Sequence, residues 1–170
     1  GASTTALDIS QSRLQRLHEN LDRTGLKADI IVADARAHRT TGYDVVVLDA
    51  PCSATGTIRR HPDLPFAKDG AQFSALFDLQ AQLLDHALER MAAKGRLVYC
   101  TCSLLPDEGE AQIENALQKH SGLRVDHSAL DKDFIAQEWR VAELGLRLRP
   151  DFWAEHGGMD GFFITVLCWA

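Results

Sequence analysis

The sequence predicts an α/β domain that has a largely parallel sheet with helices on both of its faces. Short β-branched runs alternate with longer segments of helical spacing, and parallel neighbours need helical crossovers of this kind. Three of the runs lead to an aspartate, at Asp8, Asp34 and Asp49. The 170 residues, 45% of them hydrophobic, suffice for one domain that buries roughly two-thirds of its unfolded surface.

The amino-terminal residues predict a strand, a helix and a second strand. Apolar and β-branched residues predict the two strands, at 3–7 and 29–32. Between them, leucines spaced three and four residues apart predict an amphipathic helix that Ser10 caps and Gly25 ends. The leucine-bearing face of this helix is therefore expected to pack against other apolar residues.

The central residues predict the same order of elements again. Residues 43–48 have the composition of a strand, and apolar residues at helical spacing predict a helix over 73–91. We expect Gly95 to stop that helix and residues 96–100 to begin the next strand.

The carboxy-terminal residues predict one more helix and the last strands. Asp107 and Glu110 stand at capping-box spacing for the helix that follows them. Short strands are expected at 123–126 and 146–148. The continuous apolar run at 161–169 predicts a last strand that is buried on both faces.

The net charge of −6 restricts the ways in which this chain can bind nucleic acid. A protein that binds nucleic acid with its whole surface is usually basic. Any nucleic-acid binding by this chain must therefore come from a local basic patch or from a partner segment. The best local candidates are Arg59, Arg60, His61 and Lys68. The sequence contains no visible signal peptide and no apolar run of membrane length.

The four cysteines predict free thiols. They form neither a CxxC pair nor the regular framework of a small secreted domain, which favours a reducing cytoplasm. Cys100 and Cys168 lie within apolar runs and are expected to fill the core. A metal or redox site built from Cys100, Cys102 and a third cysteine is an alternative. Its spacing is poor, because alternating residues of one strand rarely supply two ligands of a tetrahedral zinc site.

The other two cysteines lie in short motifs at the ends of predicted strands. The motifs are Asp49-Ala50-Pro51-Cys52-Ser53 and Tyr99-Cys100-Thr101-Cys102-Ser103. Ligands of a parallel sheet bind beyond the carboxyl ends of its strands, so we expect the strand-end residues to gather along one edge. These residues are Asp8, Asp34, Asp49, Cys52 and Cys102. Together the two motifs predict a two-thiol site.

Three motifs, in this order, resemble the Fmu/Sun (RsmB-like) family of RNA cytosine-C5 methyltransferases. Residues 49–63 resemble the fourth motif of that family, residues 99–108 its sixth motif and residues 158–164 its closing strand. The resemblance runs from the first predicted strand to the end of the chain, and it implies a Rossmann-like class I methyltransferase fold. Enzymes that methylate nitrogen typically have Pro-Pro-aromatic where this chain has Ala50-Pro51-Cys52, which favours carbon methylation.

The resemblance implies methyl transfer from S-adenosylmethionine to C5 of a cytosine in RNA, with ribosomal RNA as the expected substrate. In that reaction Cys102 is the nucleophile that adds to C6 of the base, and Cys52 assists release of the product. Asp49 would hydrogen-bond the cytosine as charge builds up. The expected RNA contacts are Arg59, Arg60 and His61. No metal is expected at this site.

The same resemblance assigns the strand-end aspartates to the cofactor. Asp8 has the place of the acid that hydrogen-bonds ribose hydroxyls in Rossmann-like sites. Asp34 would lie beside the adenine, and Asp49 would complete the cofactor-binding set. By themselves these aspartates fit many nucleotide cofactors, so S-adenosylmethionine comes from the resemblance alone.

The family's first cofactor motif has no counterpart in this sequence. No glycine-rich loop precedes Asp8, so we expect residues 1–170 to be a carboxy-terminal part of the catalytic domain, without its first strand and its amino-terminal RNA-binding region. The strands ending at Asp8 and Asp49 would then flank a gap in the sheet, and unpaired buried backbone groups are costly. We expect the upstream part of the enzyme or another chain to fill it, or direct pairing to close it. A nucleotide- or RNA-binding fragment that does not catalyse is the alternative function.

Overall fold

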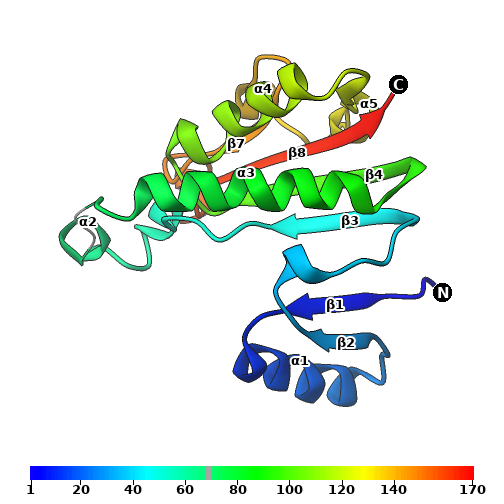
Figure 1. Cartoon of the computed structure of the whole chain (residues 1–170). Coiled ribbons are helices and arrows are strands. Elements are labelled where there is room, and N and C mark those ends of the chain that lie inside the picture. Colours follow the sequence, from blue (N-terminus) through cyan, green and yellow to red (C-terminus); the bar gives the residue numbers. More distant parts are fainter. Residues whose placement is uncertain (68–69) are drawn as a thin grey trace. The chain divides into compact units, whose positions relative to one another are not determined.

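The computed structural model describes residues 1–67 and 70–170 and divides into two compact units, 1–40 and 41–170. Figure 1 labels the helices α1 to α5 and the strands β1 to β4, β7 and β8. Lys68, a candidate for the basic patch, lies outside the described residues. None of the described helices has the length and the apolar character needed to span a bilayer.

The first unit forms a strand, a helix and a strand, as predicted. Its elements are β1 (Thr5–Asp8), α1 (Gln11–Thr24), β2 (Asp29–Val32) and the 3₁₀ helix η1 (Ala35–Ala37). β1 and β2 pair in parallel. The Ser10 hydroxyl accepts a hydrogen bond from the Arg13 N–H and caps α1, which ends at Gly25 with a φ of 67°.

The first unit buries few apolar side chains. Within residues 1–40, all of which the structure describes, Leu14 on α1 is the one buried side chain. Ile9, Leu26 and Val32 are more than half exposed. Burial of a large aliphatic side chain contributes about 1.5–3 kcal/mol, so this unit gains little stability from its own packing.

The second unit is built on one sheet. Its elements are β3 (Tyr43–Asp49), η2 (Thr55–Thr57), α2 (Leu64–Ala67), α3 (Phe73–Arg90), β4 (Met91–Thr101), η3 (Pro106–Glu108), α4 (Glu110–Lys119), β5 (Leu123–Val125), α5 (His127–Leu130), η4 (Gln137–Trp139), β6 (Arg140–Val141), β7 (Gly145–Leu148), η5 (Ala154–His156) and β8 (Phe162–Trp169). The strand order is β3-β4-β8-β7-β6, and β5 also pairs with β8.

The sheet of the second unit is mixed. β3 and β4 are parallel, whereas β8 is antiparallel to β4, β5 and β7, and β6 is antiparallel to β7. The prediction of a largely parallel sheet is therefore wrong here. The sheet is mixed because the segments that connect β6, β7 and β8 contain no long helix. Antiparallel neighbours, unlike parallel ones, need no helical crossover. Among the described strands, β1 pairs with β2 in one sheet, and β3 pairs with β4 in the other.

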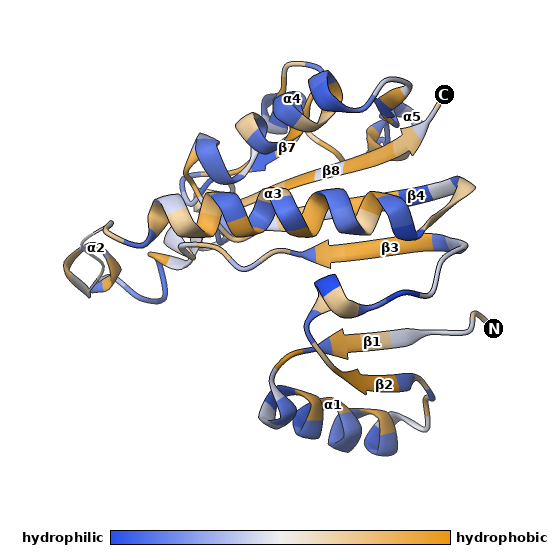
Figure 2. Cartoon of the chain, in the orientation of Figure 1, coloured by the Kyte–Doolittle hydropathy of each residue, from blue (hydrophilic) through white to orange (hydrophobic). Residues whose placement is uncertain are grey.

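The hydrophobic core of the second unit lies between the sheet and the helices α3 and α4 (Figure 1). Its fully buried aliphatic and aromatic side chains are Leu84, Leu97, Tyr99, Ile113, Phe163 and Leu167. On β3, Val46 and Leu48 pack against this core, while Val45 and Val47 on the other face are 57% and 66% exposed. Figure 2 shows that β3 is hydrophobic along most of its length. One face of β3 is thus apolar and open.

Two predicted boundaries differ from the structure. α3 ends at Arg90 rather than near Gly95, and β4 already begins at Met91. Gly95 lies inside β4 where a Cβ would be 2.7 Å from the carbonyl oxygen of Tyr43, so the glycine permits close strand pairing and does not stop the helix. The predicted capping box is also wrong. Asp107 lies within η3, and the residue that precedes α4 is Gly109, which has no side chain to cap the helix. The Glu110 carboxylate binds Arg147.

Candidate active site

Two cysteine side chains lie together at the carboxyl ends of β3 and β4. Cys52 is carried by the loop that follows β3, and Cys102 is the first residue after β4. Their sulfur atoms are 3.5 Å apart, and both side chains are only partly buried. The two motifs therefore bring their thiols together, as the two-thiol interpretation requires.

Backbone contacts hold the two cysteine loops against each other and against the start of β8. The Gly56 N–H donates to the Cys102 carbonyl at 2.9 Å, and the Gly161 N–H donates to the Gly56 carbonyl at 2.7 Å. A Cβ at position 56 would be 2.0 Å from the Gly161 oxygen, so only glycine allows this approach. All three motifs singled out in the sequence thus meet at one place.

The hydrogen bond between the sulfurs makes the two thiols unequal. The bond with Cys52 lowers the pKa of Cys102 to about 7, although burial and the charges of Asp49 and Glu108 oppose this shift. The same bond and deeper burial raise the pKa of Cys52. Cys102 is therefore the thiol that ionises near neutral pH, while Cys52 keeps its proton.

We expect the alkylation rate of Cys102 to rise through pH 7 and to level off above it. The thiolate is the reactive form, so the rate follows the ionised fraction of a thiol with a pKa of about 7. Burial, followed by the Asp49 charge, raises the pKa of the nearby Cys100 to about 11, so this thiol should react only in strong base. Peptide mapping after timed iodoacetamide pulses measures both profiles. A Cys102 midpoint near that of an ordinary free thiol would contradict the proposed inequality.

Cys100 and Cys168 take no part in the thiol pair. The Cys100 sulfur lies 3.7 Å from the Leu48 carbonyl oxygen and 3.9 Å from the Asp49 carboxylate. Cys168 is buried, as its place in an apolar run predicts. Among the described residues, no group of three His, Cys, Asp or Glu side chains could hold a metal ion.

The expected basic patch is partly neutralised by an aspartate. Arg60 donates to the Asp160 carboxylate at 2.6 Å, and Arg59 lies 3.6 Å from its other oxygen. The hydrogen bond from Arg60 lowers the pKa of Asp160, and the same bond, with a smaller contribution from the charge of Cys102, raises the pKa of Arg60. His61 is exposed beside them. The patch therefore lies within electrostatic reach of the reactive thiol.

Of the two predicted cofactor aspartates of the first unit, one lies in a strand, and the other, Asp34, lies two residues after the end of β2. Asp8 ends β1 and accepts hydrogen bonds from the Ser10 N–H at 2.7 Å and from Arg13 at 2.8 Å. Burial alone would raise the pKa of Asp8, but these bonds lower it overall. Asp34 caps η1 by accepting from the Arg36 N–H and also binds the Arg36 guanidinium. Asp49 lies at the end of β3 in the second unit.

A family model described as 16S rRNA methyltransferase RsmB/F matches residues 1–168. This chain belongs to the RsmB/F family. The resemblance that its three motifs indicate is thereby confirmed. Membership also accounts for the α/β class of the fold, because structures of related methyltransferases match nearly the whole chain.

Individual relatives of this RsmB/F chain agree with that assignment. Ribosomal RNA small subunit methyltransferase B of Pseudomonas syringae pv. tomato is 40% identical over 173 residues, which are 98% of this chain and 37% of that protein. The protein of the same name from Pasteurella multocida is 38% identical over 175 residues, again 98% and 37%. The crystal structure of NSun6 from Pyrococcus horikoshii with SFG has a TM-score of 0.81 and 26% identity, and the match covers 99% of this chain and 41% of that one. The chain thus spans little more than a third of the length of the curated relatives it matches.

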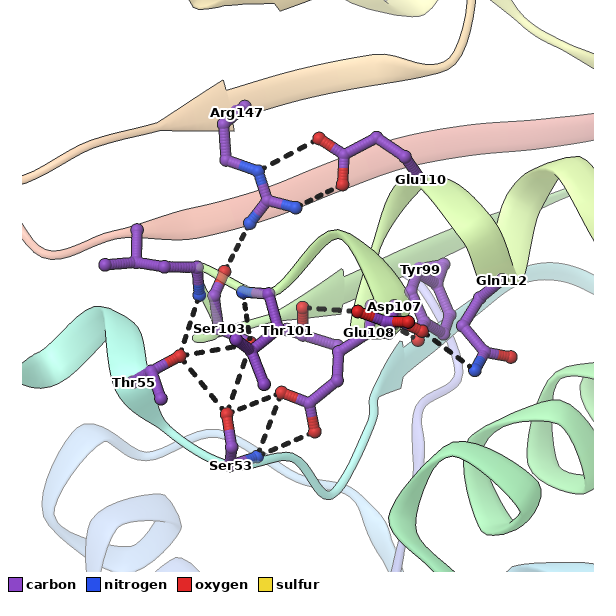
Figure 3. A network of polar contacts seen from close by, with 12 residues as sticks. Ser53, Thr55, Tyr99, Thr101, Ser103, Asp107, Glu108, Glu110, Gln112 and Arg147 are labelled. Carbon is purple, nitrogen blue, oxygen red and sulfur yellow. Dashed lines mark hydrogen bonds and ion pairs between the residues drawn. The ribbon is translucent and has the colours of Figure 1, made fainter. Parts of the chain in front are cut away.

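Several polar side chains that organise the site of this RsmB/F chain could not be predicted from the sequence. Nothing in the sequence pattern indicated that Asp160 pairs with Arg60. Glu108 and Arg147 drew no attention, although they hold the loops that carry both thiols (Figure 3). The sequence did offer a signal for Glu108, because this residue is the last one of the segment 99–108 that resembles the family's sixth motif, six residues after Cys102.

Proposed function

We propose that the complete enzyme containing this chain transfers a methyl group from S-adenosylmethionine to C5 of a cytosine in small-subunit ribosomal RNA, in the cytoplasm. The observation that carries the proposal is the pair of sulfurs 3.5 Å apart, one with a lowered pKa and one with a raised pKa. Cytosine C5 is a poor nucleophile by itself, so an enzyme that methylates it needs a thiolate close to C6.

Cys102 supplies the nucleophile in this mechanism. Its thiolate adds to C6 and forms a carbon–sulfur bond, and the electron pair of the ring double bond moves onto C5. S-adenosylmethionine, when bound, would supply the methyl group for that carbon, and its sulfonium sulfur would leave as a neutral thioether as the bond to the methyl group breaks. Removal of the C5 proton then restores the double bond and expels the Cys102 thiolate. A base has to stand near Cys102 for this last step.

Cys52 fits the release step because its pKa depends on the state of its neighbour. While Cys102 is an anion, the hydrogen bond to it keeps the proton on Cys52. Once the Cys102 sulfur is bonded to carbon it carries no charge, so the cause that raises the pKa of Cys52 is weakened. Cys52 then ionises more readily and can take part in proton removal within reach of the same bond. Cys52 would thus become able to take up a proton only after the adduct between Cys102 and the base has formed.

The aspartates supply the remaining recognition groups in this proposal. Asp49 hydrogen-bonds the cytosine and lies near the methyl donor. Asp8 fits ribose hydroxyls, since its side chain is 29% exposed and its Oδ2 atom has no hydrogen-bond partner among the residues that the structure describes. Asp34 would approach the adenine. Arg59, Arg60 and His61 would contact the RNA, with Asp160 orienting the two arginines.

We further propose that residues 1–170 form part of a catalytic domain that an upstream segment of the same enzyme, or another chain, completes. Two features support this. The face of β3 that bears Val45 and Val47 is apolar and open, and the first unit buries little beyond Leu14. Burial of apolar surface is the main favourable contribution to folding and association, so a segment that covers these residues would stabilise the domain.

The proposal is tested by trapping the covalent intermediate. We expect Cys52→Ala in the complete enzyme to accumulate a protein–RNA adduct that survives denaturing electrophoresis, because the adduct forms but its release is impaired. The measurement is a gel shift with 16S ribosomal RNA and S-adenosylmethionine, followed by mass spectrometry of the modified peptide.

The matched control is the double variant Cys52→Ala with Cys102→Ala, which should form no adduct. If Cys52→Ala turns over normally and leaves no trapped complex, the assigned roles are wrong. Binding of cofactor and RNA without methylation by the unmodified complete enzyme would favour the non-catalytic alternative.

A further inference from the structure

A carboxylate lies fully buried between the two cysteine loops. Glu108 is 0% exposed, and its side chain accepts hydrogen bonds from the Ser53 N–H at 2.8 Å and from the Ser53 hydroxyl at 2.6 Å (Figure 3). It also accepts a hydrogen bond from the Gln80 amide at 3.0 Å. All of these donors are neutral, and no ion pair of Glu108 is found in the described part of the chain. Burial of a carboxylate without a cation is costly, and an apolar side chain would fill the same space without this cost.

The hydrogen bonds of Glu108 reach both sides of Cys52. Ser53, which follows Cys52, donates to the carboxylate through its backbone and its hydroxyl. Gln80 of α3 donates both to the carboxylate and, at 2.8 Å, to the carbonyl of Pro51, which precedes Cys52. One carboxylate thus fixes the backbone on either side of the first thiol.

The main chain of Glu108 is attached to the strand that leads to the second thiol. Its carbonyl oxygen accepts from the Tyr99 hydroxyl at 2.9 Å and from the Thr101 hydroxyl at 3.3 Å. Thr101 is the last residue of β4 and directly precedes Cys102. Glu108 therefore links the segment before Cys102, through its own backbone, to the loop around Cys52, through its side chain.

Other contacts hold the residue that follows Cys102. The Ser103 hydroxyl lies 3.2 Å from the hydroxyls of both Ser53 and Thr55, and the Arg147 guanidinium donates to the Ser103 carbonyl (Figure 3). Arg147 is fixed in turn by Glu110. These bonds keep Ser103 in place, whereas Glu108 is linked to the backbone on both sides of Cys52, directly at Ser53 and through Gln80 at Pro51.

We propose that Glu108 is a positioning residue that sets the separation of the Cys52 and Cys102 sulfurs. It touches neither thiol and acts through Ser53, Gln80 and the end of β4. The expected effect of Glu108 on methyl transfer rests on the proposed function. Its expected effect on the distance between the two sulfurs does not. The two can therefore be tested separately.

The first test compares Glu108→Gln with the matched control Asp107→Asn in the complete enzyme. Both changes remove one carboxylate charge from η3, but Asp107 is exposed and its side chain makes no contact with the Cys52 loop among the described residues. We measure the rate at which diamide, a two-electron oxidant, joins Cys52 and Cys102 in a disulfide. Misplacement by about 1 Å can cost up to roughly 100-fold in reactions of aligned groups, so we expect at least about a 10-fold slower rate in Glu108→Gln and no change in the control.

The pH profile of Cys102 alkylation separates positioning from charge and from a purely structural role. If Glu108→Gln separates the two sulfurs, the hydrogen bond from Cys52 to Cys102 is lost. The pH midpoint of Cys102 alkylation then rises, because this bond lowers the pKa of Cys102. Loss of the Glu108 charge alone would lower the midpoint, since this charge opposes the shift. A purely structural role would leave the midpoint unchanged in protein that is still folded. Positioning thus predicts an upward shift.

Methyl transfer supplies the third readout. Glu108 is buried away from ligands, so Glu108→Gln should lower kcat by about 100-fold with the KM values for RNA and cofactor unchanged. An unchanged disulfide rate in folded Glu108→Gln, together with a midpoint that falls or stays, would overturn the proposal. If Glu108→Gln does not fold by circular dichroism, Ser53→Ala, which removes one bond to the carboxylate, is measured in the same way. Absence of methyl transfer in the unmodified enzyme would contradict the proposed function, and the disulfide rates would still decide the role of Glu108.

Discussion

Cys102→Ala in the complete enzyme should reduce methyl transfer by about 10⁶-fold, the scale on which removal of a covalent nucleophile acts. No other described thiol near C6 could replace it. Cys52 keeps its proton because its pKa is raised, and the pKa of Cys100 is raised to about 11. Neither side chain therefore supplies a thiolate at neutral pH. The loss should appear in kcat, since alanine leaves the surrounding contacts in place.

The measurement is transfer of labelled methyl groups from S-adenosylmethionine to 16S ribosomal RNA under single-turnover conditions. Cys100→Ala is the matched control, because it removes the thiol of β4 that lies two residues before Cys102. This variant should have a rate close to that of the unmodified enzyme. Binding of cofactor and RNA should be unchanged in both variants. Substantial residual transfer by Cys102→Ala would show that another group adds to the base.

The positions of the two thiols could be predicted from the sequence because local patterns determine them. Each motif directly follows a run of strand composition, and the ends of neighbouring parallel strands meet at one edge of a sheet. β3 and β4 are such neighbours, so Cys52 and Cys102 lie together even though 50 residues separate them. The motifs also carried the resemblance to the RsmB/F family, which the family comparison confirms.

The cause of thiolate formation could not be predicted in this way. No residue near Cys102 in the sequence identified itself as the group that lowers its pKa. That group is Cys52, and it acts through a contact between sulfurs that only the folded loops create. The same holds for Asp160 and Arg60, which are 100 residues apart and form an ion pair. Side-chain partners at such separations depend on tertiary structure, which one sequence does not display.

Local rules also failed where tertiary contacts compete with them. Gly95 and the Asp107–Glu110 spacing each match a standard helix-end pattern. In the structure Gly95 serves close strand pairing, whereas Asp107 lies within η3 and Glu110 binds Arg147. Gly95 and Glu110 thus each take part in a long-range contact. The mixed sheet has a similar origin, since β8 finds its partners through strand pairing at long range.

Gly56→Ala should separate the two cysteine loops. The new Cβ would be 2.0 Å from the Gly161 carbonyl oxygen and 2.9 Å from that of Cys102, and both are backbone atoms that cannot rotate away. The loop has to move by about 1 Å to relieve this contact, which strains the hydrogen bond from the Gly56 N–H to Cys102. Overpacking of this kind costs about 1–3 kcal/mol of stability. Misplacement by that distance should lower kcat for methyl transfer by about 100-fold.

Gly25→Ala is the control for this variant. Gly25 has a φ of 67° and open space where its Cβ would lie, so alanine there costs about 1–2 kcal/mol of backbone strain without touching the cysteine loops. Denaturant unfolding of the complete enzyme measures stability, and single-turnover assays measure transfer. If both variants lose stability but only Gly56→Ala loses transfer, the close approach of Gly56 to Cys102 and Gly161 is what aligns the thiols. Equal transfer by the two variants would mean that this alignment tolerates a displaced loop.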